Sequence, residues 1–202
     1  MAGGVLARLG LRTPEQRAWA MYDWANSAFQ CTIITAVFPI YFAKVAAEGM
    51  PDAVATARFA LATTVALTVT AILSPILGAY ADYAGMKKRL LGVFLGLGVI
   101  TTAAMYLIGP GDWKLAAWLF ILSNICISAS FVFYDSLLPH IAEGDEMDRV
   151  SSAGYALGYL GGASSVQAAL GALHREDVVT REGDRWVVVD SLMREWIARR
   201  TY

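Results

Sequence analysis

Residues 59–89 read FALATTVALTVTAILSPILGAYADYAGMKKR. The first 23 of these residues carry no charge, and most of them are Leu, Ile, Val or Ala. Crossing the roughly 30 Å hydrocarbon core of a bilayer takes about 20 helical residues. The stretch before Asp82 therefore predicts a membrane-spanning helix that ends in a charged turn.

Three further uncharged stretches have a similar length, with 20, 22 and 20 residues at 24–43, 90–111 and 115–134. The composition agrees, because 57% of the chain is hydrophobic, only 16% is charged and the mean hydropathy is +0.50, whereas soluble domains carry about a quarter charged residues. One such stretch fits the core of a soluble enzyme, but four in a row predict an all-α integral membrane protein. The net charge of −1 makes nucleic acid an unlikely partner.

The basic residues predict how the spans are oriented. Seven of them fall on one side: Arg8, Arg12, Arg17, Lys87, Lys88, Arg89 and Arg149. Three fall on the other: Lys44, Arg58 and Lys114. The positive-inside rule therefore predicts a multi-pass protein of the cell membrane with a cytoplasmic N-terminus. Arginines interrupt the first apolar run, so we do not expect a cleaved signal peptide.

The start of the first long helix is marked by Thr13-Pro14-Glu15-Gln16. Thr13 suits the N-cap position, Pro14 the first helical turn, and Gln16 the third position of a capping box. The first span is therefore expected to be the end of a longer helix that begins at the cytoplasmic surface.

The loop after the second predicted span has glycine, aspartate four residues on, glycine three further, and then a basic cluster. Its residues are Gly78, Asp82, Gly85, Lys87, Lys88 and Arg89. A generic positive-inside loop would explain the basic cluster alone. The glycine–aspartate–glycine spacing resembles the loop between the second and third helices of the major facilitator superfamily, which acts as a conformational switch.

Two further segments resemble one branch of that superfamily. Tyr22-Asp23-Trp24-Ala25-Asn26-Ser27-Ala28-Phe29 opens the first span, and Phe133-Tyr134-Asp135-Ser136-Leu137-Leu138-Pro139 closes the fourth. With Arg149-Val150-Ser151-Ser152-Ala153-Gly154 and Gly158-Tyr159-Leu160-Gly161-Gly162, they look like the vacuole-effluxer, autophagy-related branch and its bacterial members. The resemblance covers residues 13–162.

The resemblance implies a secondary transporter that is driven by a proton or another gradient and is not an enzyme. Its expected partners are the lipid bilayer, a small solute such as an amino acid, and a coupling proton. Eukaryotic members of the branch export amino acids from the vacuole, while family membership leaves bacterial substrates open.

Polar residues in two spans support a transport path independently of the resemblance. Asp23, Asn26 or Ser27, and Gln30 recur at helical spacing in the first span, and Asn124, Ser128 and Asp135 share one face of the fourth. Such stripes normally face the interior of a helix bundle. Hydrogen bonding between helices is an equal alternative for Asn124 and Ser128.

Two of these residues, Asp23 and Asp135, lie near the cytoplasmic ends of their spans. We therefore expect them to act as gate or conformational-switch residues and not as solute ligands at the centre of the membrane. Pairing of Asp135 or Asp82 with Arg89 would fasten neighbouring helices in one state.

The sequence gives little support for a catalytic, cofactor or metal site. His140 and His174 lack metal-ligand spacing, Cys31 and Cys126 fall inside predicted spans, and no cofactor motif is recognisable. We expect no catalytic residues, no cofactor and no metal site. Gly92, Gly96 and Gly98 lie in a hydrophobic run with no preceding strand, which favours helix packing over a nucleotide loop.

The share of charged residues rises near residue 164. The first 163 residues contain 21 charged side chains and the last 39 contain 12. We expect a short helix at 164–173, strands at 178–180 and 185–189 around a turn, and a final amphipathic helix. This order resembles the end of a winged-helix domain of prokaryotic ATPases, and an ordinary cytoplasmic tail is the alternative.

The predicted division is a cytoplasmic segment (1–22), a membrane domain (23–163) with a partial fifth span from 150, and a soluble α/β winged-helix-like tail (164–202). Four or five spans supply part of one half of a facilitator bundle. We therefore expect a truncated or fused chain that is inactive alone and needs a second half-transporter. The alternative function is a membrane-tethered regulatory protein that binds its partner through the tail.

Overall fold

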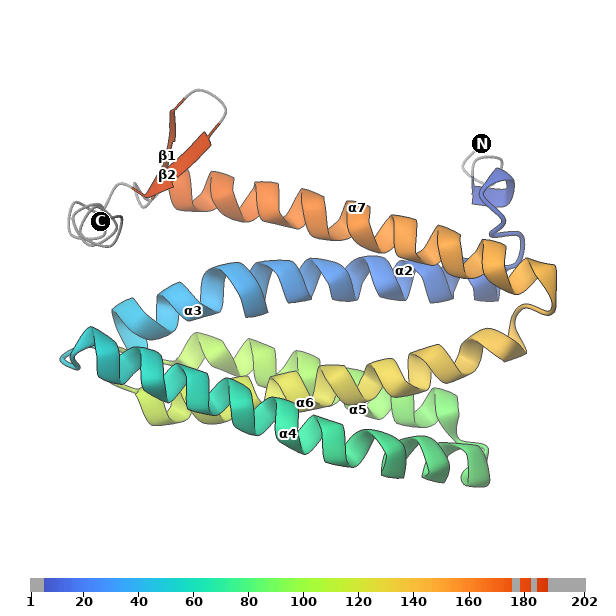
Figure 1. The fold of residues 1–202 in the computed structure, drawn as a ribbon, viewed down its shortest axis with the longest axis horizontal. Coiled ribbons are helices and arrows are strands. Elements are labelled where there is room, and N and C mark those ends of the chain that lie inside the picture. The colour runs from blue at the N-terminus through green and yellow to red at the C-terminus, as the bar shows by residue number, and fades with distance from the viewer. Residues whose placement is uncertain (1–5, 176–178, 183–184, 189–202) are drawn as a thin grey trace, which may run out of the picture.

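Long helices lying side by side make up most of the computed structural model (Figure 1), which describes residues 6–175, 179–182 and 185–188. The first long helix has four consecutive segments: α2 (Pro14–Phe29), the π-helix η1 (Gln30–Val37), α3 (Phe38–Tyr41) and the π-helix η2 (Phe42–Ala46). It is followed by α4 (Asp52–Ala84), α5 (Lys87–Ala104) with the 3-10 turn η3 (Met105–Leu107), α6 (Trp113–Leu137) with the 3-10 turn η4 (Leu138–His140), and α7 (Asp145–Arg175). β1 (Val179–Glu182) and β2 (Arg185–Val188) form an antiparallel pair.

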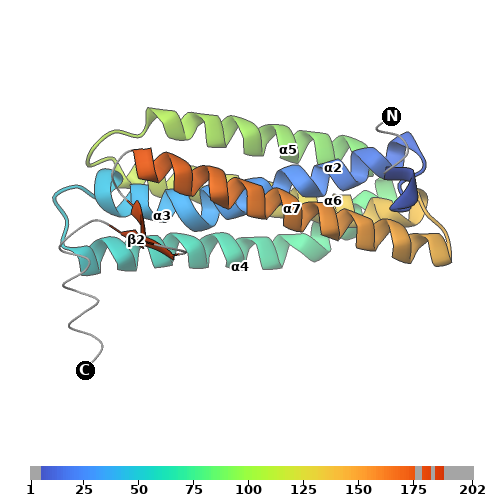
Figure 2. The ribbon, with the colours of Figure 1, turned by 90° about the horizontal axis from the view of Figure 1, so that it is seen from above.

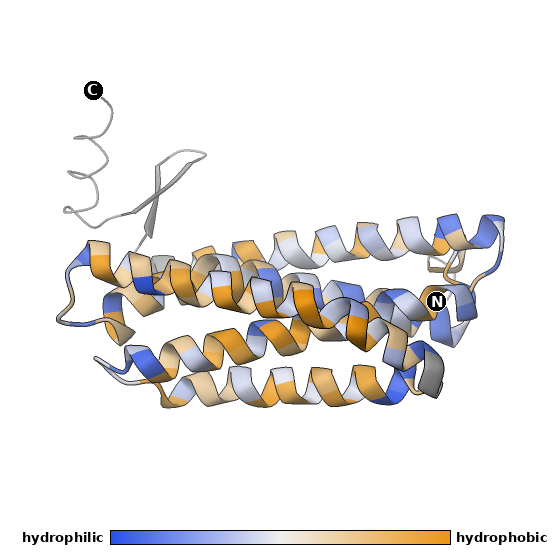
Figure 3. Cartoon of the chain, turned by 60° about the horizontal axis from the view of Figure 1, so that its bottom comes forward, coloured by the Kyte–Doolittle hydropathy of each residue, from blue (hydrophilic) through white to orange (hydrophobic). Residues whose placement is uncertain are grey.

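Four helices are long and apolar enough to cross a membrane: Pro14–Ala46, Asp52–Asp82, Lys87–Leu107 and Trp113–His140. This confirms the predicted all-α membrane bundle with four full spans. The third helix ends at Leu107 and not at residue 111, because Gly109, Pro110 and Gly111 do not support a helix. Hydrophilic residues gather towards the helix ends (Figure 3), and apolar side chains such as Leu61, Ile72 and Ile100 lie exposed along α4 and α5.

The capping box at the start of α2 is present as predicted. The Gln16 amide nitrogen donates to the Thr13 hydroxyl (3.2 Å), and the Thr13 amide nitrogen donates to Gln16 Oε1 (3.1 Å). Gln16 Nε2 also donates to the carbonyl oxygen of Ile141 (3.0 Å). The cap therefore holds the start of α2 against the connection between α6 and α7.

The helices pack as two groups, with α7 on α2 and with α6 on both α4 and α5 (Figures 1 and 2). Two buried apolar clusters join the groups. One contains Trp19, Tyr134 and Val150, and the other, at the opposite end of the bundle, contains Phe38, Phe42 and Phe120. The N-terminus, the α4–α5 turn and the α6–α7 connection share one end (Figure 1). We call it the basic end, because it holds Arg12, Lys87, Lys88, Arg89 and Arg149.

The last helix, α7, is one continuous helix from Asp145 to Arg175. A rise of about 1.5 Å per residue makes it about 46 Å long, but it is too polar to count among the four candidate spans. The separate short helix expected at 164–173 is instead the continuation of α7, so the division at 163/164 falls inside a helix. The final helix expected at the C-terminus lies outside the described residues.

Candidate functional site

The polar stripe predicted on the first span lies against neighbouring helices. Asp23 and Asn26 are buried, with 4% and 7% of their surface exposed, whereas Ser27 and Gln30 are half-buried. A Cβ atom built on Gly158 of α7 would lie 3.0 Å from both Asp23 Cγ and Ser27 Oγ. The carboxylate of Asp23 therefore points at the backbone of α7.

Several of these buried polar groups have no partner. Within the described part of the chain, Asp23 makes no hydrogen bond or ion pair, and Asn26 Nδ2 and the Tyr134 hydroxyl are buried without a hydrogen bond. Burying a polar group without a hydrogen bond costs about 1–3 kcal/mol, and burying a charge costs more. Groups left in this condition are candidates for contact with a solute, a water molecule or a proton.

The second carboxylate of the predicted stripes, Asp135 on α6, is exposed and lies close enough to Asp23 for the two negative charges to interact. Asn124 is buried and Ser128 is half-buried on the same helix, and neither side chain forms a hydrogen bond to another described residue. The Ser123 hydroxyl instead forms a hydrogen bond with Thr102 Oγ1 (2.8 Å) between helices, and the Tyr22 hydroxyl donates one to Ser130 Oγ.

An aromatic cluster next to this stripe joins the two motif-bearing helices. Trp19 stacks on Tyr134 with ring centroids 4.4 Å apart, and Tyr22 stacks on Tyr134 at 4.8 Å. Trp19 Nε1 donates to the carbonyl oxygen of Tyr134 (3.1 Å), and Phe131 meets both tyrosine rings edge-on. Sequence reasoning assigned no role to these aromatics, although Tyr22 and Tyr134 stand directly before the two aspartates.

Glycines on one face of α7 allow α2 to approach closely. A Cβ atom on Gly154 would overlap the Trp19 ring, and one on Gly161 would overlap the carbonyl oxygen of Trp24. Glycine is the residue that permits such contact between helices in a membrane. These glycines belong to the segments that resemble the family. Their packing role, however, can be recognised only once the position of α2 is known.

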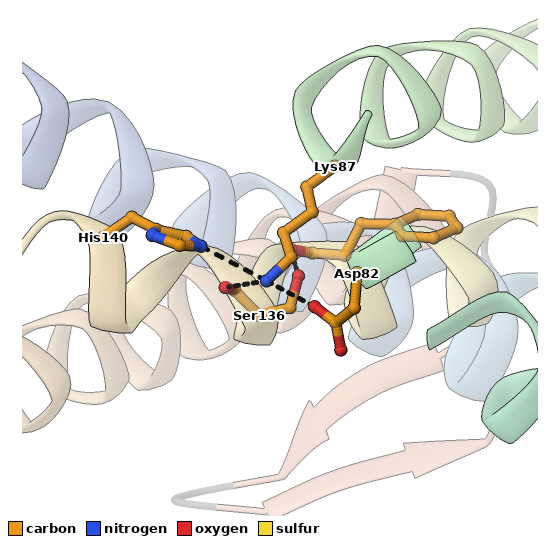
Figure 4. A network of polar contacts seen from close by, with 5 residues as sticks. Asp82, Lys87, Ser136 and His140 are labelled. Atoms are coloured by element: carbon orange, nitrogen blue, oxygen red, sulfur yellow. Dashed lines mark hydrogen bonds and ion pairs between the residues drawn. The ribbon is translucent and has the colours of Figure 1, made fainter. Parts of the chain in front are cut away.

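The loop between α4 and α5 is held by an ion pair between Asp82 and Lys87, with 2.6 Å between Oδ1 and Nζ. Lys87 Nζ also lies 3.4 Å from the carbonyl oxygen of Ser136 and 3.2 Å from His140 Nε2 (Figure 4). We call Asp82, Lys87, Ser136 and His140 the clasp, because they join the ends of α4, α5 and α6.

In this arrangement Asp82 pairs with Lys87 and not with the expected Arg89, and the described residues show no ion pair between Asp135 and Arg89. The remaining loop residues support the turn. Gly85 ends α4 with a positive φ of 60°, a conformation that costs other residues strain, and a Cβ atom on Gly78 would lie 3.6 Å from Val132. Lys88 and Arg89 are exposed.

The first span changes to π-helix at Gln30, the last residue of the polar stripe. Thr35 Oγ1 donates to the Gln30 carbonyl oxygen (3.0 Å), five residues back. Pro39, just beyond this segment, lacks the amide proton that a regular helix would use. π-Helical turns are common at functional sites, and Pro39 is a signal in the sequence from which an irregular helix could have been predicted.

A hollow of about 180 Å³ lies at the end of the bundle opposite the basic end, between the first span and α5. Its lining is mostly apolar: Ile33, Val37, Phe38, Tyr41, Thr102 and Met105. None of the predicted site residues lines it. The polar stripe, the aromatic cluster and the clasp all lie towards the basic end.

Comparison with known proteins identifies the family. Residues 49–184 match the model for the family described as "Vacuole effluxer Atg22 like". The chain is 39% identical over 150 residues to the "Uncharacterized MFS-type transporter YxiO" of Bacillus subtilis, covering 74% of this chain and 35% of the relative. It is 33% identical over 108 residues to "Autophagy-related protein 22-1" of Penicillium rubens, covering 50% and 18%.

The chain thus spans about a third of the length of the Bacillus subtilis relative and less than a fifth of the Penicillium rubens one. No solved structure matches the chain. The resemblance of the tail to a winged-helix domain has no support, since the family match continues through α7 to residue 184 and the final helix is outside the described residues. The four spans and the family match together show that the chain belongs to the vacuole effluxer Atg22-like family.

Proposed function

We propose that this chain is part of a secondary transporter that moves a small solute across a membrane along the polar residues of the first span and α6. We call these residues the polar seam: Asp23, Asn26, Gln30, Asn124, Ser128 and Asp135. The observation that carries the proposal is two polar groups buried without a hydrogen bond, Asn26 Nδ2 and the Tyr134 hydroxyl, together with the mostly buried side chain of Asp23, inside helices of membrane-spanning length. Polar groups are costly inside a membrane and are retained where they serve transport.

The solute that best suits this seam is an amino acid. The amides of Asn26, Gln30 and Asn124 and the hydroxyl of Ser128 offer donors and acceptors to an ammonium group and a carboxylate. Asp23 and Asp135 act as gate residues at the basic end, with a proton gradient as the driving force. The vacuole-effluxer description of the family supports export of small solutes.

The clasp is the proposed conformational lock of this transporter. Lys87 joins Asp82 to the end of α6 in the present arrangement, Gly85 allows the turn, and Gly78 lies beside Val132 of α6. Lys88 and Arg89 would anchor the loop at the membrane surface. Release of Lys87 would free the ends of α4 and α5 from the end of α6 when the transporter changes state.

The basic end is proposed to face the cytoplasm, with the protein in the cell membrane. Since facilitator transporters enclose their path between two halves, a second half-transporter would supply the facing helices, and the chain alone would not catalyse uptake.

Complementation of transport tests this proposal. The chain would be reconstituted in liposomes with the part of the Bacillus subtilis relative that it does not match, a proton gradient imposed, and a panel of labelled amino acids screened. Saturable uptake by the pair, with none by either piece, is the expected result. Absence of uptake by the pair contradicts the transport proposal, and uptake by the chain alone contradicts the need for a second half.

A further inference from the structure

Lys87 is the central residue of the clasp, because its ammonium group contacts the other three members (Figure 4). Its Nζ lies 2.6 Å from Asp82 Oδ1, 3.2 Å from His140 Nε2 and 3.4 Å from the carbonyl oxygen of Ser136. A lysine ammonium group has three protons to donate and no lone pair with which to accept. These protons match the three contacts, so His140 Nε2 accepts a hydrogen bond from Lys87.

This role fixes the protonation state of His140. A neutral imidazole has one nitrogen that donates and one that accepts, whereas a protonated imidazole only donates. Since Nε2 accepts from Lys87, the ring of His140 is neutral in this arrangement and carries its proton on Nδ1. The closed clasp, with Lys87 on its three acceptors, therefore requires the neutral form of His140.

The end of α6 explains why Lys87 and His140 meet there. Pro139, in the 3-10 turn η4, has no amide proton and cannot donate to the Ser136 carbonyl oxygen three residues back. That oxygen instead accepts from Lys87. The last carbonyl groups of a helix also attract positive charge, so a protonated His140 would compete with Lys87 for the same helix end.

Other charged residues lie on the helix ends around His140, because α5 and α4 meet α6 there and α7 packs on η4. They are Asp135 of α6, Lys88 and Arg89 of α5, and Asp145, Glu146, Asp148 and Arg149 of α7. In the described part of the chain none of these forms a hydrogen bond or an ion pair with His140, and Asp82 of α4 pairs with Lys87. Lys87 is therefore the charge that His140 meets at hydrogen-bond distance.

We propose that His140 is a pH-dependent positioning residue of the clasp, which holds Lys87 in place while it is neutral and releases Lys87 when it is protonated. Protonation of Nε2 removes the acceptor and puts a second positive charge 3.2 Å from Lys87 Nζ. Histidine is the side chain whose charge ordinarily changes between about pH 5 and 8. A fall in pH at the basic end therefore opens the clasp, and a rise closes it.

This role of His140 rests on the proposed function only for its purpose, since the clasp is the proposed conformational lock of the transporter. Its test follows the clasp and not uptake. A pH-dependent clasp in a chain that fails the complementation assay would contradict the transport proposal alone. Transport with a clasp that ignores pH would overturn the role of His140 alone.

The reactivity of a thiol at position 136 reports the state of the clasp. The test uses a chain in which Cys31 and Cys126 are replaced by alanine. Ser136→Cys adds one thiol to this chain and keeps the carbonyl oxygen that accepts from Lys87. The rate of its modification by a water-soluble maleimide would be divided, at each pH, by the rate in the same chain with His140→Gln. Glutamine accepts a hydrogen bond but does not titrate, so the ratio removes the effect of thiol ionisation.

The ratio should rise about threefold or more as the pH falls from about 8 to about 5, because release of Lys87 frees the ends of α4 and α5 from the end of α6. In Lys87→Ala, whose clasp is already open, the ratio should stay constant. A constant ratio with Lys87 present would overturn the proposal. A rise that persists in Lys87→Ala would also overturn it, since the effect would then come from the histidine charge acting on the thiol.

The tautomer of His140 gives a second test, in the chain with its natural serine and cysteines. The chain has 2 histidines, so His174→Gln leaves His140 alone, and nitrogen NMR spectra of labelled histidine distinguish the Nδ1–H form from the Nε2–H form. We expect the Nδ1–H form at about pH 8 and loss of this preference in Lys87→Ala. The Nε2–H form with Lys87 present would overturn the acceptor role of His140, even if the Ser136→Cys chain failed to fold.

Discussion

The indole of Trp19 stacks on the ring of Tyr134, with centroids 4.4 Å apart and planes 10° apart, while its Nε1 donates to the Tyr134 carbonyl oxygen. This contact joins the first and fourth spans at the basic end. Trp19→Ala should lower the free energy of unfolding by about 3–5 kcal/mol, and Trp19→Phe by about 1 kcal/mol through the lost hydrogen bond. Thermal unfolding in detergent measures both, and equal losses would contradict the assigned hydrogen bond.

Replacing a glycine by alanine should have opposite effects on stability at Gly161 of α7 and at Gly96 of α5. Gly161→Ala places a methyl group against the carbonyl oxygen of Trp24, which is backbone and cannot move aside, so we expect a loss of about 1–3 kcal/mol. Gly96 on α5 has no atom within 4 Å of its built Cβ, so Gly96→Ala should stabilise the helix by up to about 1 kcal/mol. Loss of stability in both variants would contradict the packing.

The helices were predictable from the sequence because span length and lack of charge depend on local composition alone. The capping box was predictable for the same reason. The packing of Gly98 was also anticipated, since its Cβ would meet Ile127, but Gly92 and Gly96 face open space. Whether a glycine in a helix meets a neighbour depends on the neighbour's position, which the sequence pattern does not contain.

The errors have physical causes of the same kind. Lys87 and Arg89 differ by two residues, or about 200° around a helix, so choosing the partner of Asp82 requires the orientation of α5 relative to α4. The glycines and serines of α7 lowered its apolar character and suggested a broken span, yet those small residues allow its contact with α2. The burial of Asp23 likewise depends on α7, which lies more than 120 residues further along the chain.

The clasp should affect conformational change more than stability. The Asp82 side chain is 66% exposed and that of Lys87 18%, and ion pairs in contact with water contribute about 0–1 kcal/mol. Lys87→Ala should therefore change unfolding by less than about 1 kcal/mol but raise the reactivity of a cysteine placed at Ser136. Lys88→Ala is the matched control, and equal reactivity in both variants would contradict the clasp.

The orientation of the bundle predicts which loops a membrane-impermeant thiol reagent reaches from outside intact cells. In a chain without Cys31 and Cys126, a cysteine at position 114 should react, whereas one at position 88 should react only after the membrane is opened. Reaction at position 88 in intact cells would reverse the assigned orientation and place the clasp outside the cell.

The proposal that the polar seam between α2 and α6 carries the solute is tested most directly by Asn26→Ala. Asn26 Nδ2 is buried without a hydrogen bond. Because Asn26→Ala removes this unpaired group, the substitution should leave the unfolding temperature unchanged or raise it. We predict that Asn26→Ala lowers the initial uptake rate about tenfold or more in the complementation assay, while Thr64→Ala, at an exposed position of α4, does not. Unchanged uptake by a stably folded Asn26→Ala chain would contradict the claim.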